Sequence, residues 1–324
     1  MSSAAGARLA ASFKMLTLSA PQQPNTSNAK AHALLFTVIL LLQQDVDLNH
    51  RGIRKLEGLE ELVNVESLCL RQNYVTKIEC LETLTKLTDL DLYDNRLSRI
   101  ENLEALTNLT SLDLSFNGIR VIENLGSLTR LTKLFLISNK ITHIAGLDSL
   151  TNLTMLELGA NRIRVIENLD RLVNLESLFL GKNKITRLQN LDGLISLRVL
   201  SIQSNRIVRL EGLSQLVSLE ELYISHNGIE VIEGLESLTR LTTLDLASNR
   251  VKRVTGVRHL VKLEEFWFND NLLEHWEDVD QLQLAKQLQT VYFHGNPISK
   301  ETAYRRKVKL ALPSLTQIDA TRCV

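Results

Sequence analysis

Cysteine is scarce in this chain of 324 residues, and its scarcity argues against a disulfide-bonded scaffold. The three cysteines, Cys69, Cys80 and Cys323, are odd in number, widely spaced and form no CxxC pair. Secreted and extracellular proteins commonly use paired cysteines because an oxidising compartment keeps disulfides intact. We therefore expect a reducing compartment.

An excess of charge of either sign is also missing. Lys and Arg number 37, as do Asp and Glu, so the formal net charge is zero. Proteins that bind nucleic acid usually present a basic surface that neutralises phosphates, so we expect no nucleic-acid partner. Aromatic residues make up only 5% of the chain, so those that stand at repeated positions are informative.

No hydrophobic run is long enough to cross a bilayer. The apolar run over residues 31–42 has about 12 residues, whereas a membrane-spanning helix needs roughly 20, so we expect no membrane span. It leads straight into polar Gln43, Gln44 and Asp45. We interpret residues 1–44 as a disordered tail with a short apolar segment. A signal or transit peptide is the alternative, since residues 1–30 contain no acid.

Recognisable catalytic motifs are missing from the sequence. None of the seven histidines lies in H-E-x-x-H spacing or joins a cysteine pattern suited to zinc. The chain contains no G-x-S-x-G, no P-loop and no G-x-G-x-x-G motif. We therefore predict that it is not an enzyme and that it has no catalytic residues, no metal site and no cofactor.

One period organises most of the chain, because an asparagine recurs every 22 residues without a slip. The series is Asn73, Asn95, Asn117, Asn139, Asn161, Asn183, Asn205, Asn227, Asn249 and Asn271. An apolar residue, usually leucine, stands eight, five and three positions before each, as Leu175, Leu178 and Leu180 do before Asn183. This L-x-x-L-x-L-x-x-N pattern is the signature of leucine-rich repeats.

The spacing predicts the structure of each repeat. Alternating L-x-L residues have the period of a β-strand, so each repeat should add one short strand with its leucines in the core. The asparagine amide can donate and accept, so we expect it to satisfy buried backbone groups where the chain turns. The predicted fold class is α/β: a leucine-rich-repeat solenoid (horseshoe) with a parallel β-sheet on the concave face, short 3₁₀ or single-turn helices on the convex face and a C-terminal repeat cap.

Both ends depart from the repeat in ways that predict boundaries. Residues 46–53 keep the phase but lack the asparagine, and Asn296 follows Asn271 by 25 residues. Residues 304–312 have a helical pattern that Pro313 ends. We predict three regions: an N-terminal tail over 1–44, a solenoid of about 12 repeats over 45–298 and a C-terminal cap over 299–324.

The position four residues before each asparagine varies while the frame stays constant. It lies between the two strand leucines and should point out of the concave face. Along the chain it is Cys69, Asp91, Asp113, Phe135, Glu157, Phe179, Ser201, Tyr223, Asp245, Trp267 and Tyr292. Framework requirements do not explain these acids and aromatic residues. Because aromatic anchors beside charges are typical of interface hot spots, we interpret the row as a binding surface.

The acids indicate a protein partner with a basic patch. The position six before the asparagine adds Asp89, Glu221 and Glu265. RNA could stack on the aromatic residues, but the surrounding carboxylates would repel its phosphates. The plainer alternative is that Phe135 and Phe179 only pack against their neighbours.

Four segments fix residues that the repeat leaves free: residues 68–73, 179–186, 265–271 and 304–319. Through them, the chain from about Asp45 to Thr321 resembles the regulatory subunit 7 family of protein phosphatase 1, which is nuclear and built of 22-residue repeats. The resemblance implies a regulatory subunit without activity of its own, a monomer when free, in the nucleus and cytoplasm. Its implied partner is the phosphatase catalytic subunit, bound on the concave face.

The resemblance also implies particular contact residues. The phosphatase-contacting residues of the family match Asp113, Phe135, Glu157, Phe179, Asp245, Glu265, Trp267 and Tyr292 of this sequence. All but Glu265 belong to the row four residues before the asparagine. The short basic-x-Val-x-Phe/Trp motif by which many phosphatase partners dock is missing, so recognition would rest on the folded surface.

Several alternatives stay open on the sequence alone. The runner-up is another intracellular repeat scaffold, such as a splicing-particle or axonemal adaptor. A secreted receptor-like repeat depends wholly on the apolar run over 31–42. Whether binding inhibits, activates or matures the phosphatase is open, as is the presence of a third, inhibitor protein.

Overall fold

The computed structural model describes residues 44–323, which divide into two compact units. Unit 1 comprises Met1–Ile141 and Ala145–Leu153, described from residue 44 on. Unit 2 comprises Thr142–Ile144 and Thr154–Val324, described up to residue 323. All but residue 44 of the predicted tail lies outside the described residues. The predicted borders at 44/45 and 298/299 stay predictions.

Unit 1 is a β-solenoid in which each coil contributes one three-residue strand. Its strands are β1 (Asp45–Asp47), β2 (Ser67–Cys69), β3 (Asp89–Asp91), β4 (Ser111–Asp113) and β5 (Lys133–Phe135). Neighbouring strands pair in parallel, with Leu90 of β3 beside Leu112 of β4. Because the pairing register equals the repeat period, each repeat position stacks on itself from coil to coil.

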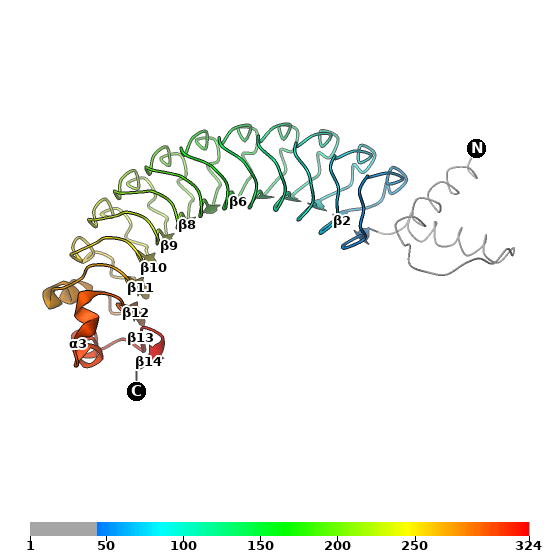
Figure 1. The fold of residues 1–324 in the computed structure, drawn as a ribbon. Helices are drawn as coiled ribbons and strands as arrows, with labels where there is room; N and C mark the ends of the chain where they lie inside the picture. Colours follow the sequence, from blue (N-terminus) through cyan, green and yellow to red (C-terminus); the bar gives the residue numbers. More distant parts are fainter. Residues whose placement is uncertain (1–43, 324) are drawn as a thin grey trace, which may run out of the picture. The chain divides into compact units, whose positions relative to one another are not determined.

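Unit 2 continues the same construction through seven repeat strands. They are β6 (Met155–Glu157), β7 (Ser177–Phe179), β8 (Val199–Ser201), β9 (Glu221–Tyr223), β10 (Thr243–Asp245), β11 (Glu265–Trp267) and β12 (Thr290–Tyr292). All neighbours pair in parallel. Within this unit the strands line the inner side of the curve and the turns form its outer side (Figure 1). The predicted parallel sheet on the concave face is confirmed.

The outer side consists mainly of single turns. In one coil the Leu172 N–H donates to the Leu169 carbonyl at 2.9 Å, and the Leu175 N–H donates to Leu172 at 3.0 Å. Such bonds between residues three apart are single 3₁₀ turns. Within residues 44–323, runs long enough to be 3₁₀ helices are η1 (Trp276–Leu282) and η2 (Pro297–Lys300), both near the C-terminus.

The core of each unit is a stack of leucine and isoleucine columns. Leu178 of β7, Leu180 directly after this strand and Ile185 in the following turn are fully buried, and the same positions are buried in the neighbouring coils. Burying each such side chain stabilises the fold by about 1.5–3 kcal/mol. Towards the C-terminus the leucines give way to a buried aromatic group, in which Phe266 and Phe268 stack at 5.3 Å between ring centroids.

The asparagine ladder has the structural role that the spacing predicts. The Asn183 amide nitrogen donates to the carbonyls of Leu158 and Leu180, both at 3.0 Å. Its oxygen accepts the Ile163 N–H at 3.0 Å. One side chain thus connects its own coil with the preceding one and satisfies backbone groups that water does not reach.

The C-terminal cap closes the sheet of unit 2. The helix α3 (Tyr304–Ala311) confirms the predicted helical segment and ends before Pro313. Strand β13 (Gln317–Ile318) pairs in parallel with β12, and β14 (Thr321–Arg322) then runs antiparallel to β13. The cap covers the last core layer, as an open solenoid requires. No helix within residues 44–323 is long and apolar enough to span a membrane.

Candidate functional site

The last residue of each repeat strand forms what we call the exposed strand row, which corresponds to the variable position of the repeat. All its members are at least partly exposed except Ser201 and Asp245, which are buried. In unit 2 the row is Glu157, Phe179, Ser201, Tyr223, Asp245, Trp267 and Tyr292. Strand pairing places each of these residues beside the next. Asp113 and Phe135 are neighbours in the row of unit 1. Six of the eight predicted site residues therefore lie in unit 2 and two in unit 1.

Three aromatic residues of unit 2 form a connected group, which we call the aromatic cluster: Tyr223, Trp267 and Tyr292. The Tyr223 and Trp267 rings meet edge to face at 6.4 Å between centroids. The Trp267 and Tyr292 rings are tilted at 5.7 Å. All three residues are half-buried, so each presents part of its ring to solvent. Such exposed rings offer apolar area to a partner together with a fixed geometry.

Two glutamates orient the rings of this cluster. The Tyr223 hydroxyl donates to Glu221 Oε2 at 2.8 Å, and the Trp267 indole Nε1–H donates to Glu265 Oε2 at 3.1 Å. Each glutamate stands two residues earlier, so it lies on the same face of its strand as the ring. Burial and the Glu221 hydrogen bond raise the pKa of Tyr223, so its phenol keeps the proton it donates. Glu265 therefore contacts the aromatic cluster although it lies outside the row.

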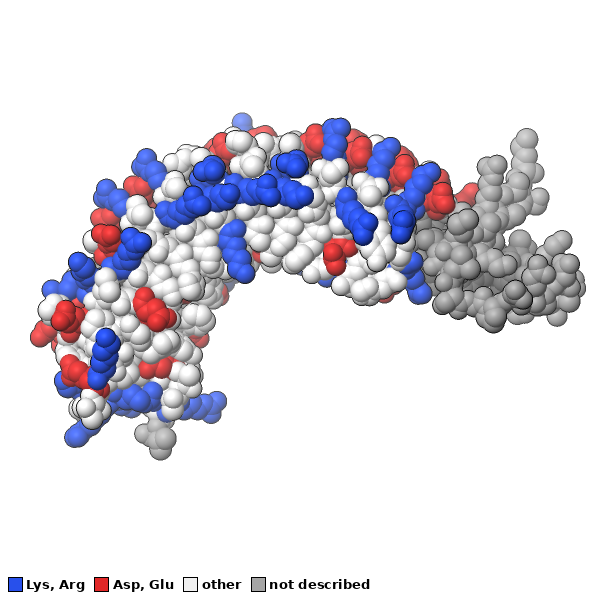
Figure 2. All heavy atoms as spheres, viewed as in Figure 1, with Lys and Arg blue, Asp and Glu red and all other residues white. Residues whose placement is uncertain are grey.

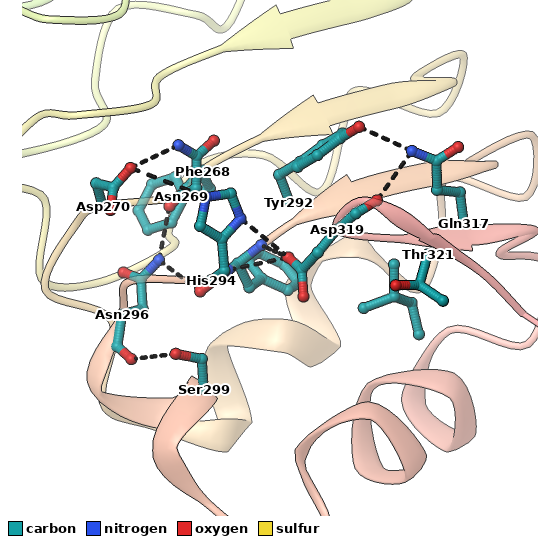
Figure 3. Close-up of polar contacts among 12 residues, drawn as sticks. Phe268, Asn269, Asp270, Tyr292, His294, Asn296, Ser299, Gln317, Asp319 and Thr321 are labelled. Atoms are coloured by element: carbon teal, nitrogen blue, oxygen red, sulfur yellow. Dashed lines mark hydrogen bonds and ion pairs between the residues drawn. The ribbon is translucent and has the colours of Figure 1, made fainter.

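The cap orients the third ring (Figure 3). Gln317 Nε2 donates to the Tyr292 hydroxyl at 2.8 Å and to the Asp319 backbone carbonyl at 2.9 Å. The His294 ring meets Tyr292 edge to face at 6.0 Å, and its Nδ1 lies 3.5 Å from Asp319 Oδ1. A residue from β13 thus positions one from β12 at the end of the cluster.

The acids of the row have a framework role that the sequence interpretation missed. Asp113 Oδ1 accepts the Ser115 N–H at 2.8 Å, and Glu157 Oε1 accepts the Gly159 N–H at 2.7 Å. Asp245 Oδ1 accepts the Ala247 N–H at 2.9 Å. In each case the carboxylate satisfies the backbone donor two residues on, at the start of the turn. The backbone of the repeat therefore explains part of the acidic pattern. The prediction that framework requirements do not explain these acids was wrong.

Burial also affects the charge of these acids. Desolvation raises the pKa of the Glu157 carboxyl and of the Asp245 carboxyl. Asp245 is only 5% exposed and lies between Tyr223 and Trp267 in the row. Its ionised form is costly to hold there, and an approaching cation would relieve that cost.

Phe135 and Phe179, the two phenylalanines of the row, are half-buried in units 1 and 2 respectively. Neither belongs to an aromatic pair within residues 44–323. Tyr223 and Gln317 were not among the eight predicted residues. A glutamate two residues before an aromatic residue, shared by β9 and β11, could have pointed to Tyr223. Gln317 lies beyond the last repeat, where the period carries no information.

Metal-ligand clusters and reactive thiols are two features that could support catalysis, and both can be checked among the described residues. Between residues 44 and 323, no group of three or more His, Cys, Asp or Glu could hold a metal ion. Burial raises the pKa of the Cys69 thiol and raises that of Cys80 to about 11. Both thiols therefore stay protonated near neutral pH, which makes them poor nucleophiles.

Comparison with known proteins agrees with this fold. The leucine-rich-repeat family matches residues 83–180 and 215–323, more than half of the chain, and the chain belongs to that family. Over a shorter stretch it is similar to protein phosphatase 1 regulatory subunit 7 of Homo sapiens, with 62% identity over 46 residues. That stretch spans 14% of this chain and only 13% of the human protein.

A second curated relative and a solved structure extend the comparison. Protein phosphatase 1 regulatory subunit SDS22 of Schizosaccharomyces pombe is 57% identical over 44 residues, 13% of each chain. An internalin from Listeria monocytogenes superposes with a TM-score of 0.73 at 25% identity, over 98% of this chain and 96% of its own.

Proposed function

We propose that this chain is a non-catalytic regulatory subunit that binds the catalytic subunit of the serine/threonine phosphatase protein phosphatase 1. The proposed contact surface is the exposed strand row of unit 2 together with Glu265, with Asp113 and Phe135 of unit 1 as further contacts. The names of the similar human and fission-yeast proteins support the identity of the partner. The aromatic cluster is the single observation that carries the proposal.

The cluster has the properties of a protein-binding hot spot. Hot spots are rich in Trp and Tyr whose rings are already in place before the partner arrives. Trp267 and Tyr223 meet this requirement because glutamates hold their polar atoms. The surrounding carboxylates of Glu221, Asp245 and Glu265 favour a partner surface that combines apolar area with Lys or Arg.

In this proposal the chain supplies a surface, and the phosphatase supplies the chemistry. The complex is proposed to exist in the nucleus and the cytoplasm and to admit a third, inhibitor protein. Fluorescence imaging of the tagged chain tests the location. Size-exclusion chromatography of the free chain with light scattering tests whether it is a monomer.

The decisive experiment measures affinity between the full chain and the purified phosphatase catalytic subunit. The double variant Trp267→Ala with Glu265→Ala should weaken binding by about 2–4 kcal/mol, as hot-spot truncations do. A matched control is available elsewhere in unit 2, because the Trp276 Nε1–H donates to Glu301 Oε1 at 2.7 Å. The variant Trp276→Ala with Glu301→Ala removes the same chemistry outside the row and should leave affinity unchanged.

Three outcomes would contradict the proposal. If the wild-type chain bound no phosphatase, the proposal would be refuted. The leading proposal would then be that the chain is another kind of intracellular repeat scaffold. An equal loss in both double variants would move the contact surface away from the aromatic cluster. Unchanged affinity in the Trp267 and Glu265 variant would do the same.

A further inference from the structure

Three consecutive coils of unit 2 contain a stretch that is rich in cations and lacks acids. The stretch begins directly after each strand and covers the turn that follows it, at residues 158–166, 180–188 and 202–210. These segments carry seven Lys and Arg residues and no Asp or Glu. The next coil breaks the pattern, with Gly228 after its ladder asparagine and Glu230 two residues later.

The frame places these cations in line. Arg162, Lys184 and Arg206 each follow a ladder asparagine directly. The Lys184 N–H donates to the Ile163 carbonyl, and the Arg206 N–H donates to the Ile185 carbonyl, both at 2.8 Å. These bonds hold equivalent positions side by side in successive coils. With strands about 4.8 Å apart, the three backbone positions span about 10 Å.

Two of the seven cations are neutralised within the unit. Arg187 pairs with Glu211 at 3.0 Å, and Arg209 pairs with Glu233 at 3.1 Å. Both acids come from the next coil. These two arginines lie further along the turn, where the repeat supplies a glutamate.

The other five cations form what we call the basic strip: Arg162, Arg164, Lys182, Lys184 and Arg206. None of the five side chains has an ion pair within residues 44–323. All are exposed except the half-buried Lys184. Figure 2 shows Lys and Arg side chains gathered over the repeats that Figure 1 draws in green.

The unpaired cations of the basic strip repel one another, and this repulsion opposes folding. The chain as a whole is neutral, so the strip is not part of a general excess of cations. The same unit compensates Arg187 and Arg209 with acids but leaves the strip uncompensated. An anionic ligand would remove the repulsion.

We propose that the basic strip binds an acidic polypeptide segment of a second protein partner. The three segments that carry the strip contain no aromatic residue, so nucleic-acid bases would find no ring on which to stack. An extended peptide advances about 3.3 Å per residue, so about three of its residues span the basic strip from Arg162 to Arg206.

The strip and the aromatic cluster occupy different parts of unit 2. Each residue of the row ends a strand, whereas the strip residues lie three to seven positions further along the chain, on either side of the ladder asparagine. The strip is therefore available while the row is occupied. This proposal does not depend on the identity of the partner on the row.

The test uses the full chain and a fluorescein-labelled Glu-rich peptide of about ten residues, with binding read by fluorescence anisotropy. Charge reversal at the strip, Arg162→Glu with Lys184→Glu and Arg206→Glu, should weaken binding by about tenfold or more. Binding should also weaken as ionic strength rises from about 50 to about 300 mM. The matched control, Lys262→Glu with Lys286→Glu and Lys300→Glu, changes net charge equally at exposed positions of unit 2 and should retain most of the affinity.

A milder variant separates binding from folding. Replacing the same three strip cations by Gln removes their charge without adding acids, and circular dichroism checks the fold of every variant. Equal losses in the strip and control variants would overturn the proposal, as would no binding of the Glu-rich peptide to wild type at low salt. An oligouridylate that binds as tightly as the peptide would show that the strip recognises nucleic acid instead.

Discussion

Trp267 and Glu265 lie two residues apart on one face of β11, and the indole Nε1–H donates to the carboxylate at 3.1 Å. Tyr223 and Glu221 repeat this arrangement on β9 at 2.8 Å. Each glutamate keeps its ring in one orientation while the ring is half-exposed. The rings are therefore already ordered in the folded chain, so binding a partner requires little further loss of side-chain conformational entropy.

Removing Glu265 alone should loosen Trp267 without removing the ring. In a Trp276→Phe background, which leaves Trp267 as the remaining tryptophan, Glu265→Ala should lower the fluorescence anisotropy of the indole. Affinity for the phosphatase catalytic subunit should fall by about 0.5–1.5 kcal/mol, the usual cost of immobilising one side chain. Asp192→Ala serves as the control, because this exposed acid lies in another coil of unit 2 and its loss should leave the Trp267 signal unchanged. An unaltered indole after Glu265→Ala would contradict this account of the pair.

Asn183→Ala should destabilise unit 2 strongly. The change removes the side-chain acceptor of the Ile163 N–H and one of the two asparagine donors to each of the Leu158 and Leu180 carbonyls. An unsatisfied buried N–H costs about 1–3 kcal/mol where water cannot replace the partner, and with the two lost carbonyl contacts we expect a total loss of about 2–4 kcal/mol.

Urea unfolding followed by circular dichroism measures the effect of Asn183→Ala. The exposed Thr186→Ala in the same coil should stay within about 0.5 kcal/mol of wild type. Similar midpoints for the two variants would show that the ladder amide contributes little.

Asp245→Asn should stabilise the fold at neutral pH. Burial raises the pKa of Asp245, so its folded-state pKa lies above the unfolded value and the ionised carboxylate is disfavoured in the folded chain. This penalty is fully present above the folded-state pKa and disappears as pH falls below the unfolded value of about 3.9. Asparagine is neutral throughout, and its oxygen can still accept the Ala247 N–H.

Thermal unfolding between about pH 3 and pH 7 tests the Asp245 prediction. The variant should unfold at a higher temperature than wild type near pH 7, and the difference should shrink towards pH 3. Asp192→Asn, at an exposed position of the same unit, should show no such trend. A variant less stable than wild type at pH 7 would mean that the backbone hydrogen bond needs a full negative charge.

Asp319→Ala should detach the cap from the last repeat. Asp319 Oδ1 accepts the N–H groups of Phe293 and His294 at 2.8 and 3.0 Å, and Oδ2 accepts the Tyr304 hydroxyl at 2.9 Å. Losing these three bonds should cost about 2–4 kcal/mol and expose the C-terminal core layer.

Limited proteolysis followed by mass spectrometry should detect earlier cleavage in the cap of the Asp319→Ala variant than in wild type. Phosphatase affinity should fall with it, because Gln317 of the cap positions Tyr292. Glu274→Ala, at an exposed position outside the cap, should digest like wild type. Cleavage at the wild-type rate in Asp319→Ala would assign the cap's attachment to its apolar contacts alone.

The repeat period was sufficient to predict the frame. Spacing of 22 residues predicts one strand per coil, and the structure confirms this because the strand register equals that period. The asparagine ladder and the cap helix were predictable for related reasons, since amide chemistry and helical spacing are local properties. The row that holds Trp267 and Tyr292 also followed from the alternation of a strand.

Contacts between side chains at the variable positions could not be predicted from the repeat period and were decided by the folded chain. Arg187 and Arg209 pair with glutamates that the repeat places in the next coil, whereas Arg162, at another position of the turn, has no ion pair within the described residues. Gln317 reaches Tyr292 from a cap that has left the repeat altogether. The reason is physical: backbone hydrogen bonds repeat wherever the spacing repeats, but a side-chain contact requires particular residues from two coils to meet.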